Sequence, residues 1–250
     1  MTENRGRTPA EDRLLWAAKS GRGIGAIVRA LDAGANLNVR GRGGETPLQT
    51  AVIEGHIPCA RFLLDRGADP DSRCDYGRTP LHEAAHHRRP DCTALLLEYG
   101  ADPDIRDKQD CTPLHMAAMH DHHDDARLLL EHGADLSAQD RGGETPLHVA
   151  ASWGPQGGCV LLFLGRGANP DVRDQNGQTP LHGAARKGLS ECVRLLLDYG
   201  AGLEWQDIDG RTARDLALEG GHADCVDLID TRSDGNALDA LWNARMGGKP

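Results

Sequence analysis

Histidines and aspartates gather in one short stretch of the chain, residues 115–125, which reads His-Met-Ala-Ala-Met-His-Asp-His-His-Asp-Asp. Imidazole nitrogens and carboxylate oxygens are ligands that divalent metals accept. Histidine also changes its charge near neutral pH. The stretch therefore predicts either a metal site or a pH-sensitive patch, with a solvated helix end as the plain alternative. The candidate metal ligands are His87, His120, His122 and His123.

A repeated phrase sets the spacing of these side chains. Thr-Pro-Leu begins at Thr46, Thr79, Thr112, Thr145 and Thr179, and a degenerate copy begins at Thr212, with steps of 33, 33, 33, 34 and 33 residues. Such a period is typical of stacked supersecondary units. The same step aligns His87 with His120, and it places Asp125 where neighbouring repeats carry cysteine. A carboxylate in that apolar layer must find a partner or shift its pKa.

One unit shows the local signals for two helices. Thr79 can act as N-cap and Pro80 suits the first helical position. Leu81, with alanines three and four residues later, forms an apolar stripe. A second helix is expected to start near Pro90 and to end at Gly100, which can adopt the left-handed conformation. A polar, extended turn should follow.

These residues resemble the ankyrin repeat, whose pattern of Thr-Pro-Leu-His-x-Ala-Ala, Gly-His, Leu-Leu and Gly-Ala-Asp is almost complete at 46–71 and 179–201. The resemblance covers about residues 10–230. It implies an all-α solenoid of helix pairs with protruding β-turn fingers, in which finger tips and first helices form a concave binding surface. It also implies a structural role for the histidine of the phrase, present as His82, His115, His148 and His182.

The repeats divide residues 1–231 into an ankyrin repeat domain, with 232–250 as a C-terminal tail. Full units are expected at 41–73, 74–106, 107–139, 140–173 and 174–206, and degenerate capping units at 8–40 and 207–231. Thr8 and Glu11 form a capping-box pattern five residues earlier than the period predicts, so the first helix should be longer. Residues 235–246 are either a short capping helix or a disordered tail.

The cysteines are expected to be reduced. Cys59, Cys92, Cys159, Cys192 and Cys225 occupy equivalent places, and stacked helices lie about 8–10 Å apart, too far for disulfides. They are therefore interpreted as small buried residues. Cys74 and Cys111 fall in turns, where exposure is expected.

Partner contacts are expected at the ends of first helices and along the fingers. Trp153 is the most prominent candidate, because exposed tryptophan is a common hot spot; burial in a pocket made by the nearby one-residue insertion is the alternative. Basic residues recur along the fingers, where they would either pair with neighbouring aspartates or attract an acidic partner. The predicted contact residues are Arg73, Tyr76, Arg78, His86, His87, Arg106, Lys108, Met119, His120, Arg141, Trp153, Arg173, Arg186 and Lys187.

Other function classes find little support. The net charge of −10 argues against a general nucleic-acid binder, although the basic finger residues keep that alternative open. No nucleophile elbow or phosphate-binding loop is present, and no apolar run is long enough to span a membrane. We therefore expect a cytoplasmic, monomeric, non-enzymatic scaffold that binds a protein partner and needs no cofactor. The alternative is a metal- or pH-responsive regulator built on the His/Asp cluster.

Overall fold

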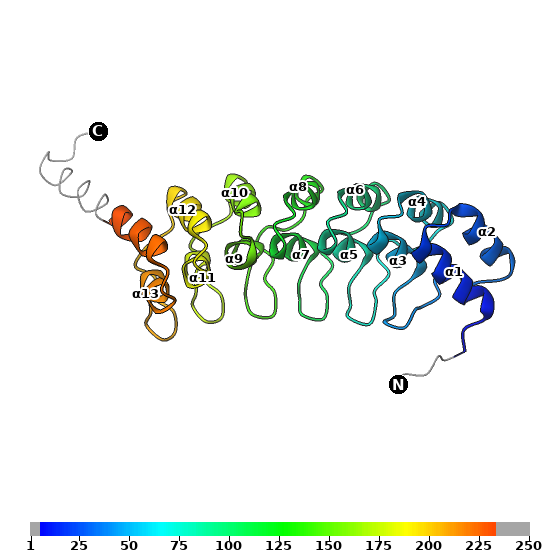
Figure 1. Ribbon diagram of the computed structural model, residues 1–250, viewed down its shortest axis with the longest axis horizontal. Coiled ribbons are helices and arrows are strands. Elements are labelled where there is room, and N and C mark those ends of the chain that lie inside the picture. Colours follow the sequence, from blue (N-terminus) through cyan, green and yellow to red (C-terminus); the bar gives the residue numbers. More distant parts are fainter. Residues whose placement is uncertain (1–5, 234–250) are drawn as a thin grey trace, which may run out of the picture. The chain divides into compact units, whose positions relative to one another are not determined.

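The computed structural model describes residues 6–233, and this part of the chain is all-α, without β-strands (Figure 1). It contains two compact units. Unit 1 comprises residues 6–117 and 122–141, and unit 2 comprises residues 118–121 and 142–233. None of the helices described here is both long and apolar enough to cross a membrane.

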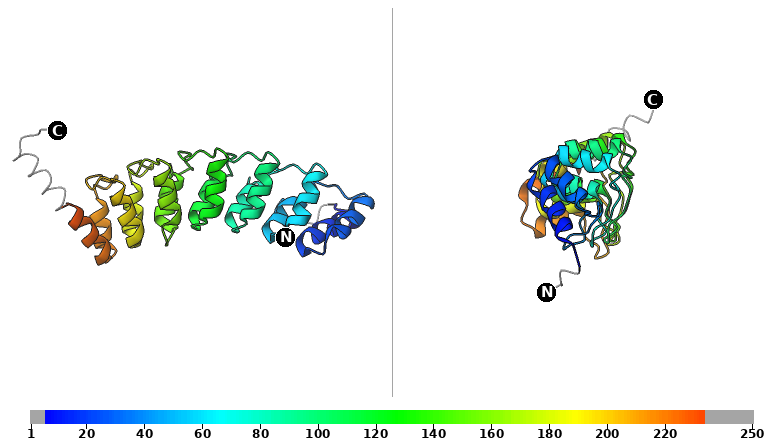
Figure 2. Two further views of the ribbon diagram at one scale, coloured as in Figure 1. Left: turned by 90° about the horizontal axis from the view of Figure 1, so that it is seen from above. Right: turned by 90° about the vertical axis from the view of Figure 1, so that its right-hand side faces the viewer.

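Helices come in pairs, a leading helix that opens with the repeated phrase and a following helix. Unit 1 holds the helices α1 (Pro9–Ser20), α2 (Ile24–Asp32), α3 (Pro47–Glu54), α4 (Ile57–Asp65), α5 (Pro80–His86), α6 (Pro90–Glu98) and α8 (His123–Glu131). Leading helices α1, α3 and α5 pack side by side, and so do following helices α2, α4, α6 and α8 (Figure 2). The expected longer first helix is confirmed, with the Thr8–Glu11 capping box at its start.

Unit 2 repeats this plan. It holds the helices α9 (Pro146–Trp153), α10 (Gly158–Gly165), α11 (Pro180–Lys187), α12 (Ser190–Asp198) and α13 (Ala213–Glu219), and residues 223–233 are also helical. Leading helix α11 packs between α9 and α13, and α10 packs on α12. Helix α7 (Pro113–Met119) begins in unit 1, and its last residues belong to unit 2. The predicted segment 235–246 lies outside the described residues.

Local sequence signals explain where the helices begin and end. In α5, the side chains of Thr79 and His82 cap the first turn reciprocally, and Pro80 fills the first helical position. Helix α6 begins at Pro90 as expected, and Gly100 follows it with a φ of 80°. Leu81, Ala84 and Ala85 are fully buried, so the apolar stripe forms the contact layer between helices.

Fingers connect each following helix to the next leading helix, and backbone hydrogen bonds join neighbouring fingers. In unit 1 the Asp75 amide donates to the Gly43 carbonyl (2.9 Å), and the Lys108 amide donates to the Tyr76 carbonyl (3.0 Å). In unit 2 the Ile208 amide donates to the Asn176 carbonyl in the same way (3.0 Å). These bonds hold each finger in register with its neighbour.

All seven cysteines lie within the described residues, and all are buried without forming a disulfide. The prediction that Cys74 and Cys111 are exposed is wrong. Both lie at finger bases closed by backbone bonds, Cys74 N–H to Arg78 C=O and Asp107 N–H to Cys111 C=O, which direct the thiols inward. Burial raises the pKa of the Cys92 and Cys192 thiols to about 12, so neither is a reactive thiolate near neutral pH.

Candidate partner-binding surface

The histidines of the repeated phrase hold the scaffold together. Nδ1 of His82 accepts the Thr79 amide (3.1 Å), while Nε2 lies 3.0 Å from the Cys111 carbonyl of the next repeat. His148 and His182 make equivalent bonds, to the carbonyls of Gln178 and Arg211. Since Nδ1 accepts, Nε2 must carry the proton and donate. Burial lowers the pKa of His82 to about 4, which keeps the ring neutral.

A second set of histidines, one helix further along, is also structural. His122 Nδ1 lies 2.8 Å from the Ala85 carbonyl near the end of α5, the leading helix of the previous repeat. His56 reaches the Lys19 carbonyl and His222 reaches the Arg186 carbonyl in the same way, each at 3.1 Å. His122 was a predicted metal ligand, but its Nδ1 is already engaged in a hydrogen bond between two repeats.

The remaining metal candidates are not assembled into a site. His87 lies 3.6 Å from Glu83 and packs edge-on against His86, whereas His123 lies 3.5 Å from its neighbour Asp124. His120 is exposed at the end of α7. Within residues 6–233, no group of three or more His, Cys, Asp or Glu side chains is arranged to hold a metal ion.

Asp125 is buried, as its cysteine-equivalent position predicted. Its Oδ1 accepts a 2.6 Å bond from the Thr93 hydroxyl of α6. Its Oδ2 is buried without a hydrogen-bond partner. Burial raises the pKa of this carboxyl to about 6, so it ionises only as the pH approaches neutrality.

Asp121 replaces the glycine of the usual Gly-His pair and keeps its left-handed conformation, with a φ of 54°. Its carboxylate accepts the amides of Gly158 (3.1 Å) and Cys159 (2.6 Å) at the first turn of α10. Asp121 therefore stabilises a helix start that has no capping side chain of its own. Asp121, an acidic residue of the His/Asp stretch, therefore has a structural role.

Four finger arginines donate to backbone carbonyls rather than to aspartates. Arg40 donates to the Arg73 carbonyl, Arg73 to the Arg106 carbonyl, and Arg106 to the Gln139 carbonyl, at 2.5–2.6 Å. In unit 2, Arg173 donates to the Gln206 carbonyl at 2.9 Å. Each arginine thus bridges to the equivalent residue 33 positions later. We call this series the arginine ladder.

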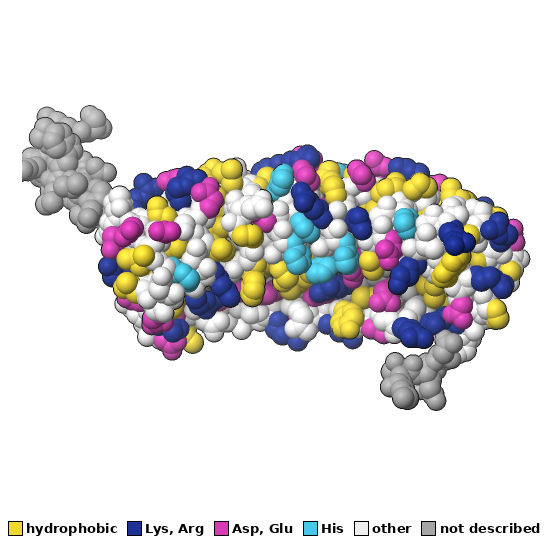
Figure 3. Space-filling view, in the orientation of Figure 1, with side chains coloured by type: hydrophobic (Ala, Val, Ile, Leu, Met, Phe, Trp, Pro, Cys, Tyr) yellow, Lys and Arg dark blue, Asp and Glu magenta, His cyan; other side chains and the backbone are white. Residues whose placement is uncertain are grey.

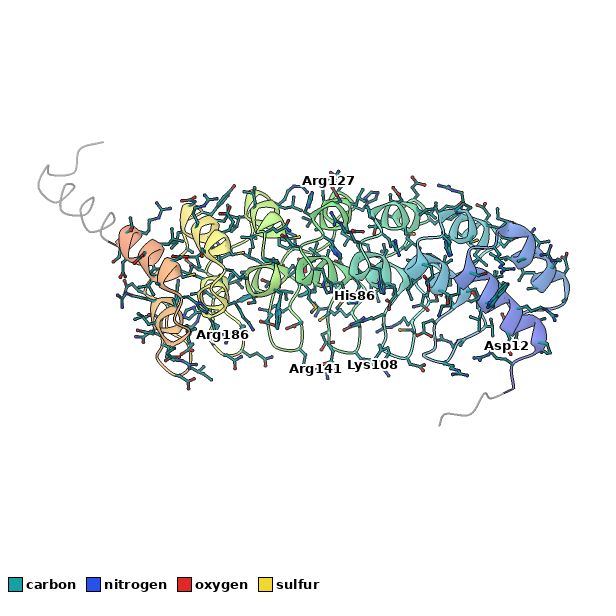
Figure 4. All side chains as sticks on the ribbon, viewed as in Figure 1. Asp12, His86, Lys108, Arg127, Arg141 and Arg186 are labelled. Atoms are coloured by element: carbon teal, nitrogen blue, oxygen red, sulfur yellow. The ribbon has the colours of Figure 1, made fainter. Side chains whose placement is uncertain are left out.

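Other basic finger residues differ among themselves. Arg78 lies 3.5 Å from buried Asp107 of the next repeat, as the ion-pair interpretation expected. Arg211 lies 2.9 Å from Asp207 of its own repeat. Arg141 donates to the Lys108 carbonyl. Lys108 and Arg141 lie at finger tips (Figure 4), and the Tyr76 side chain is 67% exposed. Tyr76 and Lys108 are therefore accessible to a partner.

Trp153 ends α9 and is 55% exposed, so the alternative that the insertion buries it is wrong. The Lys187 ammonium lies over the indole, 4.4 Å from the ring centroid. Arg186 and Lys187 lie in the exposed last turn of α11, and Figure 4 labels Arg186 beside this helix. These three residues, the Trp153 patch, combine apolar area with two positive charges on one face of unit 2.

Comparisons with known proteins agree with this geometry. The protein-family model described as "Ankyrin repeats (3 copies)" matches residues 14–107, 99–163 and 156–239. The chain belongs to the ankyrin repeat family. Domains of this family typically bind other proteins and are usually non-catalytic.

Two solved ankyrin domains illustrate the similarity. The ankyrin repeat domain of human ASB11 is 31% identical with a TM-score of 0.77, over 90% of this chain and 98% of that one. That of Bcl-3, described as a unique member of the IkappaB protein family, is 30% identical with a TM-score of 0.74, over 87% and 97%. A search of curated proteins found no match to the sequence.

Two further aromatic positions escaped the sequence-based prediction. Trp16 is 51% exposed with Arg22 over its ring at 5.0 Å, and it lines a groove of about 380 Å³ in unit 1 together with Leu15 and Ile53. Trp205 is 41% exposed beside Arg173 in a finger of unit 2. Trp16 lies in the degenerate first repeat and Trp205 in a finger turn, and the repeated phrase specifies no residue at either place. The rarity of tryptophan in the composition was the signal that could have identified them.

Proposed function

We propose that this ankyrin array is a non-enzymatic scaffold that binds a protein partner through its leading-helix ends and finger tips. The observation that carries the proposal is the Trp153 patch. The indole is half-exposed, the core does not require it, and a cation lies over its face. Exposed tryptophan and arginine are the residue types most enriched among interface hot spots.

The scaffold around the patch supports this role. Capping boxes, backbone bonds between fingers and the arginine ladder fix the exposed side chains on a rigid frame. A preorganised surface loses little conformational entropy when a partner binds, which favours affinity. We further propose that other predicted contacts also bind a partner, Tyr76, His86 and Lys108 in unit 1 and Met119 and His120 in unit 2. We also propose that the protein acts as a cytoplasmic monomer.

Affinity capture from cell extract tests the proposal. We expect the wild-type chain to retain a partner that the double variant Trp153→Ala, Lys187→Ala loses, with at least a tenfold drop corresponding to about 1.4 kcal/mol or more. Quantitative mass spectrometry of the retained proteins provides the measurement.

Leu161→Ala is the matched control. Leu161 is 49% exposed but lies on the following helix α10, in the other layer of the same unit. Retention of the same proteins by wild type, control and double variant would contradict binding at this surface.

The pH-responsive alternative rests on a different observation, the buried Asp125 carboxylate with its unpartnered oxygen. This buried carboxylate favours the interpretation that the stability of unit 1 changes with pH. The described residues offer no comparable support for the metal-binding form of this alternative, because His122 is already bonded to Ala85 and no group of ligands is assembled.

A further inference from the structure

The Trp153 patch differs from the rest of unit 2 in the partners of its basic side chains. Most basic side chains of this unit are engaged: Arg173 with a backbone carbonyl, and Arg194, Arg211, Arg214 and Arg232 with carboxylates. Within the described part of unit 2, Arg166, Arg186 and Lys187 have no ion pair. Arg166 follows α10, in the other helix layer.

Two adjacent cations without carboxylate partners are unexpected in a chain whose net charge is −10. Their position in the last turn of α11 gives part of the reason, because cations stabilise a helix C-terminus. That effect does not account for the exposed indole beneath Lys187. A tryptophan that leaves half of its surface in water gains little from folding, whereas covering it by a partner removes apolar area from water.

Neighbouring contacts hold the patch in place. The His222 ring lies 3.1 Å from the Arg186 carbonyl, and the Gly154 carbonyl after Trp153 lies 3.2 Å from the Cys192 thiol. Helices α9 and α11 pack directly against each other. Figure 3 shows basic side chains gathered beside α11 on this face. The indole and the two charges therefore form a fixed surface.

We propose that the Trp153 patch binds an acidic segment of the partner protein, whose carboxylates pair with Arg186 and Lys187 while an apolar side chain covers Trp153. The proposal rests on the proposed function and names the chemistry of its partner. Charge complementarity carries it, since these cations have no carboxylate of their own. It also moves the predicted acidic contact away from the arginine ladder, whose guanidinium groups bind backbone carbonyls.

Fluorescence anisotropy with defined peptides tests this chemistry. The probe is a short fluorescein-labelled peptide that alternates glutamate with leucine, and matched peptides replace every glutamate by glutamine or by lysine. We expect the glutamate peptide to bind about tenfold more tightly than the glutamine peptide, and the lysine peptide not to bind. Equal affinity for the glutamate and glutamine peptides overturns the proposal.

Charge reversal locates the binding. Lys187→Glu should weaken the glutamate peptide at least tenfold, and Trp153→Ala should weaken both the glutamate and glutamine peptides. Arg166→Glu, with the same change of net charge outside the patch, should have no effect. If Arg166→Glu weakens binding as much as Lys187→Glu, the attraction is not local and the proposal fails.

The outcomes also separate this inference from the proposed function. Loss of the captured partner in the Trp153→Ala, Lys187→Ala variant, together with equal affinity for the glutamate and glutamine peptides, keeps the scaffold function and removes the acidic partner. A labelled single-stranded oligonucleotide that binds more tightly than the glutamate peptide, and is lost in Lys187→Glu, would assign the patch to phosphate instead and overturn the proposal.

Discussion

Gln49 and His82 occupy the same position in neighbouring repeats and make the same bonds. The Thr46 amide donates to Gln49 Oε1 and Gln49 Nε2 donates to the Arg78 carbonyl, as Thr79 and Cys111 bond the two nitrogens of His82. The position thus requires one acceptor and one donor at a fixed separation. Imidazole meets this requirement only while it is neutral.

His82→Gln should therefore remove the pH dependence of stability that His82 causes while keeping its two hydrogen bonds. The folded-state pKa of His82 is lowered from 6.5 to about 4, so the unfolded chain takes up the proton first as the pH falls. The stability contributed by neutral His82 is present above pH 6.5 and is lost as the pH falls toward 4. At pH 5 we expect the variant to be more stable than wild type by about 2 kcal/mol, and nearly equal at pH 7.5. Urea unfolding at both pH values measures this; a difference that does not grow on acidification contradicts the assignment.

Asp125 affects the pH dependence of stability in the opposite direction. Its folded-state pKa is raised from 3.8 to about 6, so the folded chain holds the proton longer. The stability that the protonated carboxyl contributes is present below about pH 4 and is lost as the pH rises through 6. Above that pH a charge is buried with one oxygen unpartnered.

Restoring the apolar pair found elsewhere should stabilise the protein. Thr93→Val combined with Asp125→Cys reproduces the residue types of Val160 and Cys192, which occupy the equivalent positions in two later repeats and are both buried. We expect a gain of about 1–3 kcal/mol at pH 8 and a smaller gain at pH 4.5. Thr93→Val alone is the control and should destabilise, because it leaves the carboxylate without its hydroxyl donor. Denaturant unfolding gives the free energies; a loss of stability in the double variant at pH 8 would show that the buried pair is favourable.

At the scale of the elements, the arginine ladder binds one finger to the next. Each guanidinium bridges to a backbone carbonyl of the following repeat, and the amides of neighbouring fingers bond in parallel. A carbonyl partner is present whatever side chain that position carries, as Gln139 and Gln206 show. Basic finger residues in such an array are therefore not by themselves evidence for an acidic partner.

Arg106→Ala should destabilise unit 1 by about 0.5–1 kcal/mol, because an exposed charged donor to one carbonyl is lost. Lys108→Ala, two residues away on the same exposed finger, should change stability by less. Amide hydrogen exchange of the fingers and urea unfolding check the pair of variants. Equal effects of the two substitutions would mean that the ladder contributes no more than an ordinary surface side chain.

At the scale of the whole molecule, the charge balance opposes nucleic acid. The net charge is −10, and the finger arginines that could have met phosphates donate to backbone carbonyls. Nucleic-acid binding depends on phosphate neutralisation by several available cations and strengthens steeply at low salt. A gel shift with duplex DNA and single-stranded RNA at low salt should show no complex at micromolar protein. A shift that disappears as salt is raised would restore the nucleic-acid alternative.

The sequence alone predicted the repeat, its helix pairs and the structural role of the phrase. These features follow from local rules, since Thr79, Pro80 and Gly100 act on their own turn of the chain. It also identified Asp125 and Trp153, because a strict period makes any departure visible. The prediction failed for Cys74 and Cys111, whose burial depends on how a finger base folds against its helices.

Only the tertiary structure decided which polar side chains remain available. Arg73 and Arg186 are both basic residues predicted to contact a partner, yet Arg73 donates to a carbonyl of the next repeat while Arg186 has no ion pair within the described residues. His87 lies beside Glu83, four residues away, whereas His122 bonds the Ala85 carbonyl 37 residues earlier. The contacts of Arg73 and His122 join groups more than 30 residues apart, and the local pattern does not specify whether a flexible side chain meets a backbone acceptor or faces water.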